Sequence, residues 1–458
     1  MLVVGAGVAG LACAVALADR GMRVVVCDKS MAAGGRARSW ADRHTGDMVD
    51  IGPHVLHSEY RNFLGFMQRL GTRELVTWQP GKLITLASKP PLVLRHRRLP
   101  PPFSLLPDFL RAPGLDARDF ASNSRVTWRA LRFTEEDVEA LDRLTALQLL
   151  RDDGVSEPMI DWFWRFKGMV IPNAPLESCS AATLLRVYSQ LLGYRGLHFG
   201  FPAVGLGDLF VPGALHALAS QGSAVRLGEG VVRVERVAEA LQARLESGAS
   251  LRARYVVAAV PPADLAALLP ALAVAPFEPT PYISTYLWLD RPVTRERFWS
   301  MLWSPTRLHY DFYDLANIRP AWAGRDSVIA ANLIHSQRAH GLDDQAIVAA
   351  ALRELAEFAP EAADAKLLHA SVHRIPMAVV CPTPGMERNR PATRTEIPRL
   401  LLAGDWTRTA EPSSMESAAK SGYLAAEAIL EDEGRPEKLS APPVPRAGLE
   451  RLVRPPGP

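Results

Sequence analysis

Apolar residues at the start of the chain follow the pattern of a parallel sheet. Residues 1–18 carry no charge, and the apolar runs here are unbroken rather than alternating with polar residues. Unbroken runs are typical of parallel strands, because such strands are buried on both faces. The pattern predicts a strand, a helix and a second strand over residues 2–4, 8–20 and 23–27, respectively.

Strand-length apolar runs return in the second half of the chain, after a region of different character. Residues 80–200 contain proline-rich loops and long helical patterns rich in Trp and Leu. The strands predicted beyond this region lie at residues 224–227, 231–237, 241–245, 255–260, 282–289, 299–304, 328–334 and 400–403. Helices are predicted over residues 344–358 and 414–430. Two interleaved domains fit this order better than two consecutive ones.

The composition is that of a globular protein large enough to form two cores. The chain has 458 residues, of which 48% are hydrophobic and 22% charged, and its formal net charge is +3. These values exclude a disordered chain and a polytopic membrane protein. A net charge this small gives no overall basic field, so we do not expect a nucleic-acid partner.

The first 18 residues resemble a signal peptide or a short membrane span only superficially. No positive residue precedes the apolar run, and three glycines interrupt it, so we interpret it as buried structure. The four cysteines lack the spacing of a disulfide framework or a zinc site; they are Cys13, Cys27, Cys179 and Cys381. We therefore expect a cytoplasmic protein without a metal centre.

A glycine motif joins the first predicted strand to the first predicted helix. Residues 5–10 read G-x-G-x-x-G. Gly5 permits a tight turn, Gly7 lets the backbone approach a pyrophosphate, and Gly10 lets the helix pack closely on the sheet. The helix N-terminus offers free N–H groups to phosphates, and Asp28 after the second strand can accept hydrogen bonds from a ribose. These features predict a dinucleotide site.

A second glycine pair indicates which dinucleotide is bound. Residues 34–39 read Gly-Gly-Arg-Ala-Arg-Ser and follow Asp28 within one short loop. The glycine pair and Arg36 place further N–H groups and a guanidinium beside the same pyrophosphate. A cofactor held along its whole length in this way is FAD rather than exchangeable NAD. The alternative, a surface loop, leaves a related motif near the other end of the chain unexplained.

That related motif follows the last predicted strand. Residues 403–407 read Ala-Gly-Asp-Trp-Thr, and residues 413–416 have the S-x-x-E form of a helix capping box. Asp405 at a strand end can bind ribityl hydroxyls, and the following helix N-terminus can point at the flavin pyrimidine edge. Capping explains Ser413 and Glu416 as well, and the two roles are compatible.

Together these motifs resemble those of the FAD-dependent amine oxidase and carotenoid desaturase superfamily. Residues 50–54 resemble its D-x-G-x-H segment beside the flavin, and residues 283–292 resemble a substrate-domain strand of the desaturases. The C-terminal signature is matched at residues 384–387, 390–391, 403–407, 414–418 and 421–422. Within the superfamily, the chain is most similar to plant-type phytoene and ζ-carotene desaturases and to hydroxysqualene dehydroxylases.

The resemblance implies a set of FAD contacts. The residues implied to contact FAD are Gly5, Gly7, Gly10, Asp28, Arg36, Gly52, His54, Gly404, Asp405, Met415 and Glu416. The same site takes in their neighbours Val8, Ala9, Lys29, Gly35 and Pro53, and its adenine end takes in Val232.

The chain departs from the family pattern at two places near this site. Asp28 replaces the commoner glutamate, a shortening that should still let it bind the ribose. His57 and Glu59 stand where the desaturases have an aromatic and a small residue. Polar groups there could alter chemistry at the flavin, so His54 and His57 are the candidate catalytic residues. The alternative for His57 is a structural or surface position.

The resemblance and the strand pattern imply an α/β fold. We expect a Rossmann-like FAD-binding domain interleaved with an α+β substrate domain of mixed sheet and helices. The FAD-binding domain is expected to comprise residues 1–78, 205–265 and 370–434, and the substrate and membrane-contact domain residues 79–204 and 266–369. Residues 435–458 contain seven prolines and no periodicity, and we expect a disordered or loosely docked tail.

The implied function is desaturation of a long apolar isoprenoid by hydride transfer to FAD. Reductive dehydroxylation of a squalene-like alcohol is one alternative. Amine oxidation is a second, although residues 282–288 lack the lysine that such oxidases commonly carry on this strand. A third is a non-catalytic flavoprotein that carries an isoprenoid.

Two groups of residues are candidates for handling such a lipid. Apolar side chains of the substrate domain line a lipid channel or form an ordinary core; they are Trp162, Phe163, Trp164, Phe166, Tyr188, Leu191, Leu192, Phe199, Phe201, Tyr286 and Trp288. Residues 95–110 join a basic cluster to an apolar segment. This segment either docks on the inner face of a membrane or forms a solvated loop over a hydrophobic helix.

Overall fold

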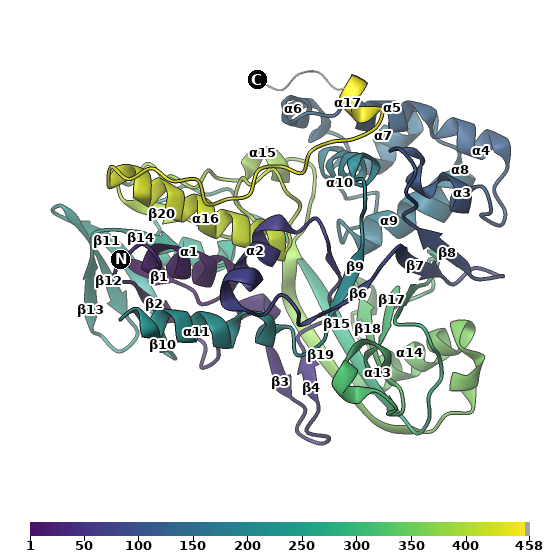
Figure 1. The fold of residues 1–458 in the computed structure, drawn as a ribbon, viewed down its shortest axis with the longest axis horizontal. Coiled ribbons are helices and arrows are strands. Elements are labelled where there is room, and N and C mark those ends of the chain that lie inside the picture. The colour runs from purple at the N-terminus through teal and green to yellow at the C-terminus, as the bar shows by residue number, and fades with distance from the viewer. Residues whose placement is uncertain (454–458) are drawn as a thin grey trace.

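The N-terminal motif lies in a five-stranded parallel sheet. The computed structural model describes residues 1–453. The strands of this sheet are, in spatial order, β10 (Ala224–Leu227), β2 (Val25–Asp28), β1 (Leu2–Val4), β14 (Val256–Ala258) and β20 (Leu400–Leu402), all parallel. Strands from three distant parts of the chain therefore build one sheet, which confirms the predicted Rossmann-like, interleaved domain (Figure 1).

Three helices cover this sheet. They are α1 (Val8–Ala18), α11 (Val211–Ser220) and α16 (Met415–Asp432). The axes of α1 and α16 approach closely because Gly422 faces α1, where a Cβ would lie 2.3 Å from the carbonyl oxygen of Ala9. Every residue of α1 is buried, which explains why this helix has no polar face.

A second, seven-stranded sheet forms the base of the other domain. Its strands are, in spatial order, β19 (Leu367–Val380), β15 (Pro279–Leu289), β18 (Val328–Leu333), β17 (Asp311–Asp314), β16 (Phe298–Ser300), β7 (Lys82–Leu86) and β8 (Leu92–Arg95). Only β16 and β7 pair in parallel, so the sheet is mixed, as expected. Helices α13 (Leu315–Ile318) and α14 (Asp344–Phe358) accompany it.

The border between the two domains differs from the one expected at residue 370. β19 pairs with β15 along nearly its whole length, from Leu367 to Val380. The substrate-domain sheet therefore extends about ten residues further along the chain than its apolar pattern suggested. Small sheets connect the domains; their strands are β3 (Ser39–Ala41), β4 (Met48–Asp50), β5 (Leu56–His57), β6 (Val76–Gln79) and β9 (Phe199–Pro202).

Short helices form the upper right part of the molecule in Figure 1. They are α3 (Leu106–Phe109), α4 (Ala117–Ser122), α5 (Ser124–Arg132), α6 (Val138–Leu141), α7 (Ala146–Asp152), α8 (Glu157–Met159), α9 (Arg165–Val170) and α10 (Ala181–Gly193), with a π-helical turn at Ile160–Trp164. Their core is dense in aromatic rings; Trp164 packs edge-on against Tyr188 with 4.7 Å between centroids.

The remaining elements pack at the edges of these layers. Helix α2 (Arg61–Leu70) lies against α16, α12 (Pro262–Leu268) against β11, and α15 (Met386–Asn389) against α6. An antiparallel sheet of β11 (Val231–Val237), β12 (Ala240–Leu245) and β13 (Ser250–Ala253) flanks the nucleotide domain. Within residues 1–453, no helix is both long and apolar enough to span a bilayer.

Residues 435–453 differ from the disordered or loosely docked tail that their proline content led us to expect. The backbone N–H of Ala441 donates to the side chain of Asn62, and Arg61 donates to the carbonyl of Pro442. Further on, the N–H of Leu449 donates to the carbonyl of Pro101, and the described part of the chain closes with α17 (Glu450–Val453). Tertiary contacts hold residues 435–449 without regular secondary structure, which composition does not reveal. Residues 454–458 lie outside the described residues.

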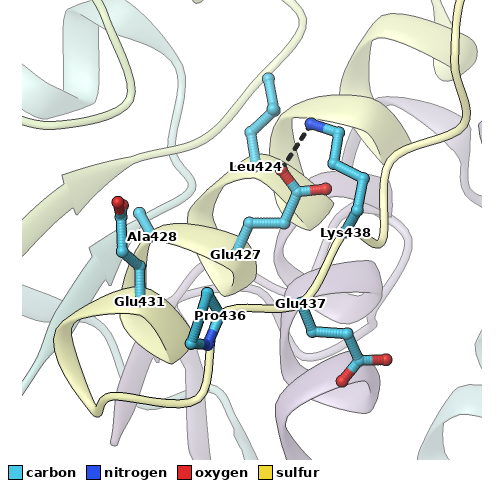
Figure 2. Close-up of a pocket in the computed structure, with 7 residues that line it drawn as sticks. All are labelled: Leu424, Glu427, Ala428, Glu431, Pro436, Glu437 and Lys438. Carbon is cyan, nitrogen blue, oxygen red and sulfur yellow. Dashed lines mark hydrogen bonds and ion pairs between the residues drawn. The ribbon is translucent and has the colours of Figure 1, made fainter.

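The segment first folds back along the end of α16. Figure 2 shows a shallow pocket of about 390 Å³ at this contact, in which Glu427 pairs with Lys438 at 2.8 Å. The other two carboxylates of this pocket are also paired, Glu431 with Arg394 and Glu437 with Arg20. We therefore interpret the pocket as a packing seam between helix and tail.

Candidate functional site

One large cavity lies between the two domains. Its volume is about 1180 Å³, and its wall includes residues of both sheets, of α16 and of the C-terminal segment. The structure brings together at this wall nearly every residue predicted for the site: Gly5, Gly7, Val8, Ala9, Asp28, Lys29, Gly35, Arg36, Gly52, Pro53, His54, His57, Val232, Gly404, Asp405, Met415 and Glu416. Gly10 is the exception and does not line the cavity.

Gly10 acts in packing, as the motif predicts. A Cβ at Gly10 would lie 1.9 Å from the carbonyl oxygen of Gly5. Gly5 has φ +109, and a Cβ there would lie 2.4 Å from the carbonyl oxygen of Ala259, which directly follows the neighbouring strand β14. Both glycines let the turn and the start of α1 press against the sheet, which directs the first N–H groups of α1 towards the cavity.

Two glycine loops face each other at the cavity wall. A Cβ on Gly35 would lie 3.3 Å from the Cα of Gly7, so the loops touch through their backbones. Asp28 fixes their position: its carboxylate accepts hydrogen bonds from the N–H of Ala6 at 2.7 Å and of Ser30 at 2.8 Å. The loops thus form a backbone cradle without side chains, of the kind that a diphosphate requires.

Arg36 and Asp405 come from opposite ends of the chain and form an ion pair. The guanidinium of Arg36 lies 2.5 Å from Asp405 and 3.3 Å from the carbonyl oxygen of Ala378. The Asp405 side chain is only 6% exposed. The pair joins the two glycine motifs along one wall of the cavity, which their separation in sequence does not show.

The N-terminus of α16 closes the same wall. Ser414 caps the helix by accepting a hydrogen bond from the N–H of Ser417. Glu416 does not return to its own cap; its carboxylate accepts from the N–H groups of Asn62 and Phe63 and from the Asn62 side chain. It therefore caps α2 instead, and burial raises its pKa. The S-x-x-E pattern placed the helix start within one residue, but the predicted capping box is wrong: Ser414 rather than Ser413 is the N-cap, and Glu416 caps α2.

A family model described as "Flavin containing amine oxidoreductase" matches residues 8–430. The match spans both domains. It includes every glycine motif described above except residues 5–7, the first turn of the N-terminal motif. The chain belongs to the flavin containing amine oxidoreductase family. FAD is accordingly the cofactor of this protein, which is an FAD-dependent oxidoreductase.

Relatives of this protein include carotenoid enzymes. The carotenoid phi-ring synthase of Streptomyces griseus is 30% identical, over 99% of this chain and 91% of that protein. The 15-cis-phytoene desaturase of Synechococcus elongatus is 24% identical, over 96% of this chain and 97% of that protein. That of an Oncidium hybrid cultivar is 27% identical, over 94% and 78% of the respective chains.

Solved structures share the fold. A variant of putrescine oxidase superposes with a TM-score of 0.74 and 16% identity, covering 94% of this chain and 98% of that one. Cyclohexylamine oxidase from Brevibacterium oxydans superposes with a TM-score of 0.64 and 20% identity, covering 95% and 99%. At such identities the likeness shows the fold of the amine oxidoreductase and leaves its substrate open.

The residues at the cavity wall fit FAD. The cradle between Gly7 and Gly35 has no side chain to obstruct a diphosphate, and the first turn of α1 faces it. Val232, 37% exposed, and Asp28 both line the cavity and offer the apolar contact and the carboxylate that an adenosine requires. Gly52, Met415 and the start of α16 line the same cavity.

Both candidate catalytic histidines line the cavity as neutral imidazoles. Burial lowers the pKa of His54, whose Nδ1 lies 2.6 Å from the carbonyl oxygen of Gly52 and donates to it. Burial lowers the pKa of His57 to about 3, and its Nδ1 accepts from the N–H of Glu59. The ring of His57 also packs on Tyr60, with 4.0 Å between centroids. Both rings are therefore weak proton acceptors.

Most of the apolar residues predicted for a lipid channel belong to the core. Of that set, Leu191 and Phe199 line the cavity, whereas the others pack among the helices or between helices and sheet. The apolar wall is instead completed by Val170, Ile171, Val187, Phe298, Ile334 and Ile375. Periodicity finds a buried face, but it does not distinguish a core from a cavity wall.

Four polar residues of the substrate-domain sheet also line the cavity and escaped the sequence analysis. They are Tyr282, Asp311, Tyr313 and Asn332. The run Asp-Phe-Tyr-Asp at residues 311–314 could have pointed to a functional carboxylate here, because two carboxylates are unusual in a strand whose residues are all buried. Only the sheet register shows which of the two faces the cavity.

Proposed function

We propose that this FAD-dependent oxidoreductase is a desaturase that removes two hydrogens from a long isoprenoid hydrocarbon. The observation that carries the proposal is the continuous cavity, which runs from the nucleotide-binding loops to an apolar wall formed by the other domain. The names of the relatives support it, since they describe enzymes of phytoene and of carotenoids.

In this proposal, residues of the nucleotide domain hold FAD. The backbones at Gly7 and Gly35 lie along its diphosphate, and Asp28 and Val232 lie at its adenosine. Asp405 and the start of α16 lie at its ribityl chain and ring. Bound FAD supplies a two-electron oxidant for a C–H bond. The chain itself orients the substrate and excludes water from the reacting carbons.

The substrate end of the cavity suits a hydrocarbon. Apolar side chains from α9, α10 and the large sheet form this end, and residues 441–446 of the C-terminal segment cover part of it. The lysines that line the cavity, Lys29 and Lys420, are paired with Asp264 and Glu411, respectively. Orientation of an apolar chain by such a wall needs shape rather than charge.

A ring-modifying activity on a carotenoid is the second candidate. The carotenoid phi-ring synthase matches 99% of this chain at 30% identity. A ring end group and an open chain both fit an apolar wall, so the two substrates must be compared directly.

Anaerobic mixing tests the proposal. Purified holoprotein is mixed with phytoene, with a cyclic carotenoid, with hydroxysqualene or with a polyamine, while flavin absorbance is recorded and products are identified by mass. We expect bleaching by phytoene, with a product two hydrogens lighter. Bleaching by the cyclic carotenoid alone would favour the second candidate. Bleaching by the polyamine alone would refute a lipid substrate, and reoxidation of reduced flavin by hydroxysqualene would indicate dehydroxylation.

We also propose that residues 95–110 contact a membrane from which the substrate enters. In this segment Leu99, Phe103, Leu106 and Leu110 are 39–63% exposed, and together they form what we name the apolar patch. Exposed Arg95 and Arg98 adjoin it. The basic cluster is smaller than the sequence suggests, since His96 is buried and Arg97 pairs with the buried Asp108 at 2.5 Å.

A further inference from the structure

Strand β17 carries two buried carboxyl groups with different surroundings. Asp314 is fully engaged: it accepts hydrogen bonds from the Ser327 hydroxyl at 2.6 Å, from the N–H of Ala316 and from Asn317. Asp311 is equally buried, at 4% exposure, but its carboxyl accepts a hydrogen bond only from the Ser300 hydroxyl, at 2.6 Å, among the described residues. Asp314 therefore has a structural explanation, whereas Asp311 has an unused acceptor.

The register of the sheet places Asp311 at the cavity. Asp311 and Asp314 are three residues apart on a strand, so they point to opposite faces. Asp311 lies directly opposite Asn332 on β18, and Asn332 donates to the carbonyl of Pro53 at 3.2 Å. The Asp311 face is thus the one that meets residues 52–54, and Asp311 itself lines the cavity there.

No cation neutralises Asp311 in the described part of the chain. Tyr282 on β15 and Tyr313 on its own strand lie close enough to interact with Asp311, and His54, which lines the same cavity, is neutral. β16 contributes Ser300 and β18 contributes Asn332, neither of them charged. Burial raises the pKa of Asp311 to about 7, against the opposing effect of the Ser300 hydrogen bond. The carboxyl group can therefore gain or lose a proton near neutral pH.

We propose that Asp311 is the proton acceptor in the oxidation of the bound substrate. This role rests on the proposed function. Two C–H bonds on adjacent carbons break and a C=C bond forms between those carbons. One hydrogen leaves with its electron pair as hydride, for which FAD is the acceptor, and the other leaves as a proton to the Asp311 carboxylate. The electrons and both hydrogens are thereby accounted for.

Asp311 fits this task better than the two histidines. The pKa of His57 is lowered to about 3 and that of His54 is also lowered, so each ring binds a proton weakly. An acceptor works best when its pKa lies near the pH at which the enzyme operates. The hydroxyl of Tyr282, buried without a hydrogen-bond partner among the described residues, lines the cavity on the same sheet.

The first test measures the titration of Asp311 without any substrate. Infrared difference spectra of the holoprotein across pH should contain a carboxylic-acid C=O band that disappears near pH 7, beside a band from Asp314, whose pKa burial raises to about 6. The band that disappears near pH 7 should be absent from Asp311→Asn, persist in the control Asp314→Asn, which removes the other band, and shift to higher pH in Ser300→Ala, which loses the donor that favours the ionised form. A band unchanged in Asp311→Asn would overturn the proposal.

The second test measures flavin reduction by an isoprenoid in a single anaerobic turnover. Asp311→Asn should slow it by about 10²- to 10⁴-fold and abolish the rise in rate with pH near 7. Ser300→Ala should move that rise to higher pH, and Asp314→Asn should leave its position unchanged. An unaltered rate and pH profile in Asp311→Asn would overturn the role of Asp311 alone. Failure of every isoprenoid to reduce the unmodified protein would overturn the proposed function instead, while the infrared band still reports on Asp311.

Discussion

Two glycines of one loop illustrate how much a single residue position decides in this protein. Gly10 is buried against backbone, because a Cβ there would lie 1.9 Å from the carbonyl oxygen of Gly5. Gly7 borders the cavity, and a Cβ there would meet nothing nearer than the Cα of Gly35 at 4.0 Å. Gly10 therefore supports the fold, whereas Gly7 leaves space for a ligand.

We predict that Gly10→Ala and Gly7→Ala fail in different ways. Gly10→Ala should lower the free energy of unfolding of the apoprotein by roughly 1–3 kcal/mol or more, because an extra methyl group must displace backbone. Gly7→Ala should leave the stability of the apoprotein within about 0.5 kcal/mol and reduce FAD retention. Urea unfolding of apoprotein and flavin content after gel filtration measure these effects. Equal losses of stability would contradict the assignment.

For single residues, the sequence predicts a role correctly where local backbone geometry sets that role. The glycine motifs, Asp28 and Asp405 could be assigned to the site because turn shape and strand ends follow from local sequence. Asp311 could not, since its significance depends on Ser300 and Asn332 from neighbouring strands. For the same reason the sequence did not show that Glu416 caps α2.

Among the elements, a buried ion network joins α10 to α15. Arg186 of α10 lies 2.5 Å from Glu387 of α15, and Arg390 lies 3.1 Å from the same carboxylate. All three side chains are at most 4% exposed. Burial alone would raise the pKa of Glu387, but Arg390 and Arg186 outweigh it and lower it to about 2.

We predict that this network makes stability sensitive to acid. The pKa of Glu387 is lowered on folding, so its contribution is complete above the unfolded pKa near 4.3 and is lost as pH falls towards 2. The loss amounts to about 3 kcal/mol. Glu387→Gln should destabilise the protein by roughly 3–5 kcal/mol at pH 7, because two buried arginines lose the carboxylate they share and only Arg186 keeps another, Glu135. The variant should also lose less stability than the wild type between pH 5 and 2, which chemical unfolding can measure.

His57 also makes the free energy of unfolding fall in acid, and it does so equally in the wild type and in Glu387→Gln. Its pKa is lowered on folding to about 3, so the unfolded chain binds a proton before the native one as pH falls below about 6.5. Stability from this residue is therefore lost between about pH 6.5 and 3 in wild type and variant alike. If the free energy of unfolding of Glu387→Gln fell with pH as steeply as that of the wild type below pH 5, the two arginines would not stabilise the ionised form of Glu387 as described.

Elements with strong periodicity could be predicted from sequence, and short ones could not. The helix expected over residues 344–358 occurs with those bounds. The strand expected over residues 299–304 is only Phe298–Ser300, because pairing with β17 ends there. Strand β13 was missed, since its pattern is too short to stand out from a loop.

In the whole molecule, the C-terminal segment connects the cavity to the apolar patch. Residues 441–446 line the cavity, and Leu449 then donates to the carbonyl of Pro101, in the loop that leads into the patch. Figure 1 shows this segment running from the end of α16 across to the helices of the other domain. The apolar patch and the cavity therefore share a structural element.

We predict that the apolar patch determines binding to anionic vesicles. The triple variant Phe103→Ser, Leu106→Ser, Leu110→Ser should sediment with phosphatidylglycerol vesicles at least about tenfold more weakly, since each side chain contributes apolar area worth on the order of 1 kcal/mol. Leu368→Ser is the control, because Leu368 is 56% exposed on β19, at the opposite edge of the seven-stranded sheet. Flavin content should stay unchanged in both. Equal vesicle binding by the triple variant and wild type would exclude this surface.

The sequence by itself determined the nucleotide domain and its cofactor. Its glycines, strand ends and apolar runs each act through local backbone geometry, which is encoded within a few residues. The tertiary structure alone decided which apolar side chains form the cavity wall, where residues 435–453 pack and which carboxyl group of β17 faces the cavity. These features depend on contacts between residues far apart in the chain, and no local pattern records such contacts.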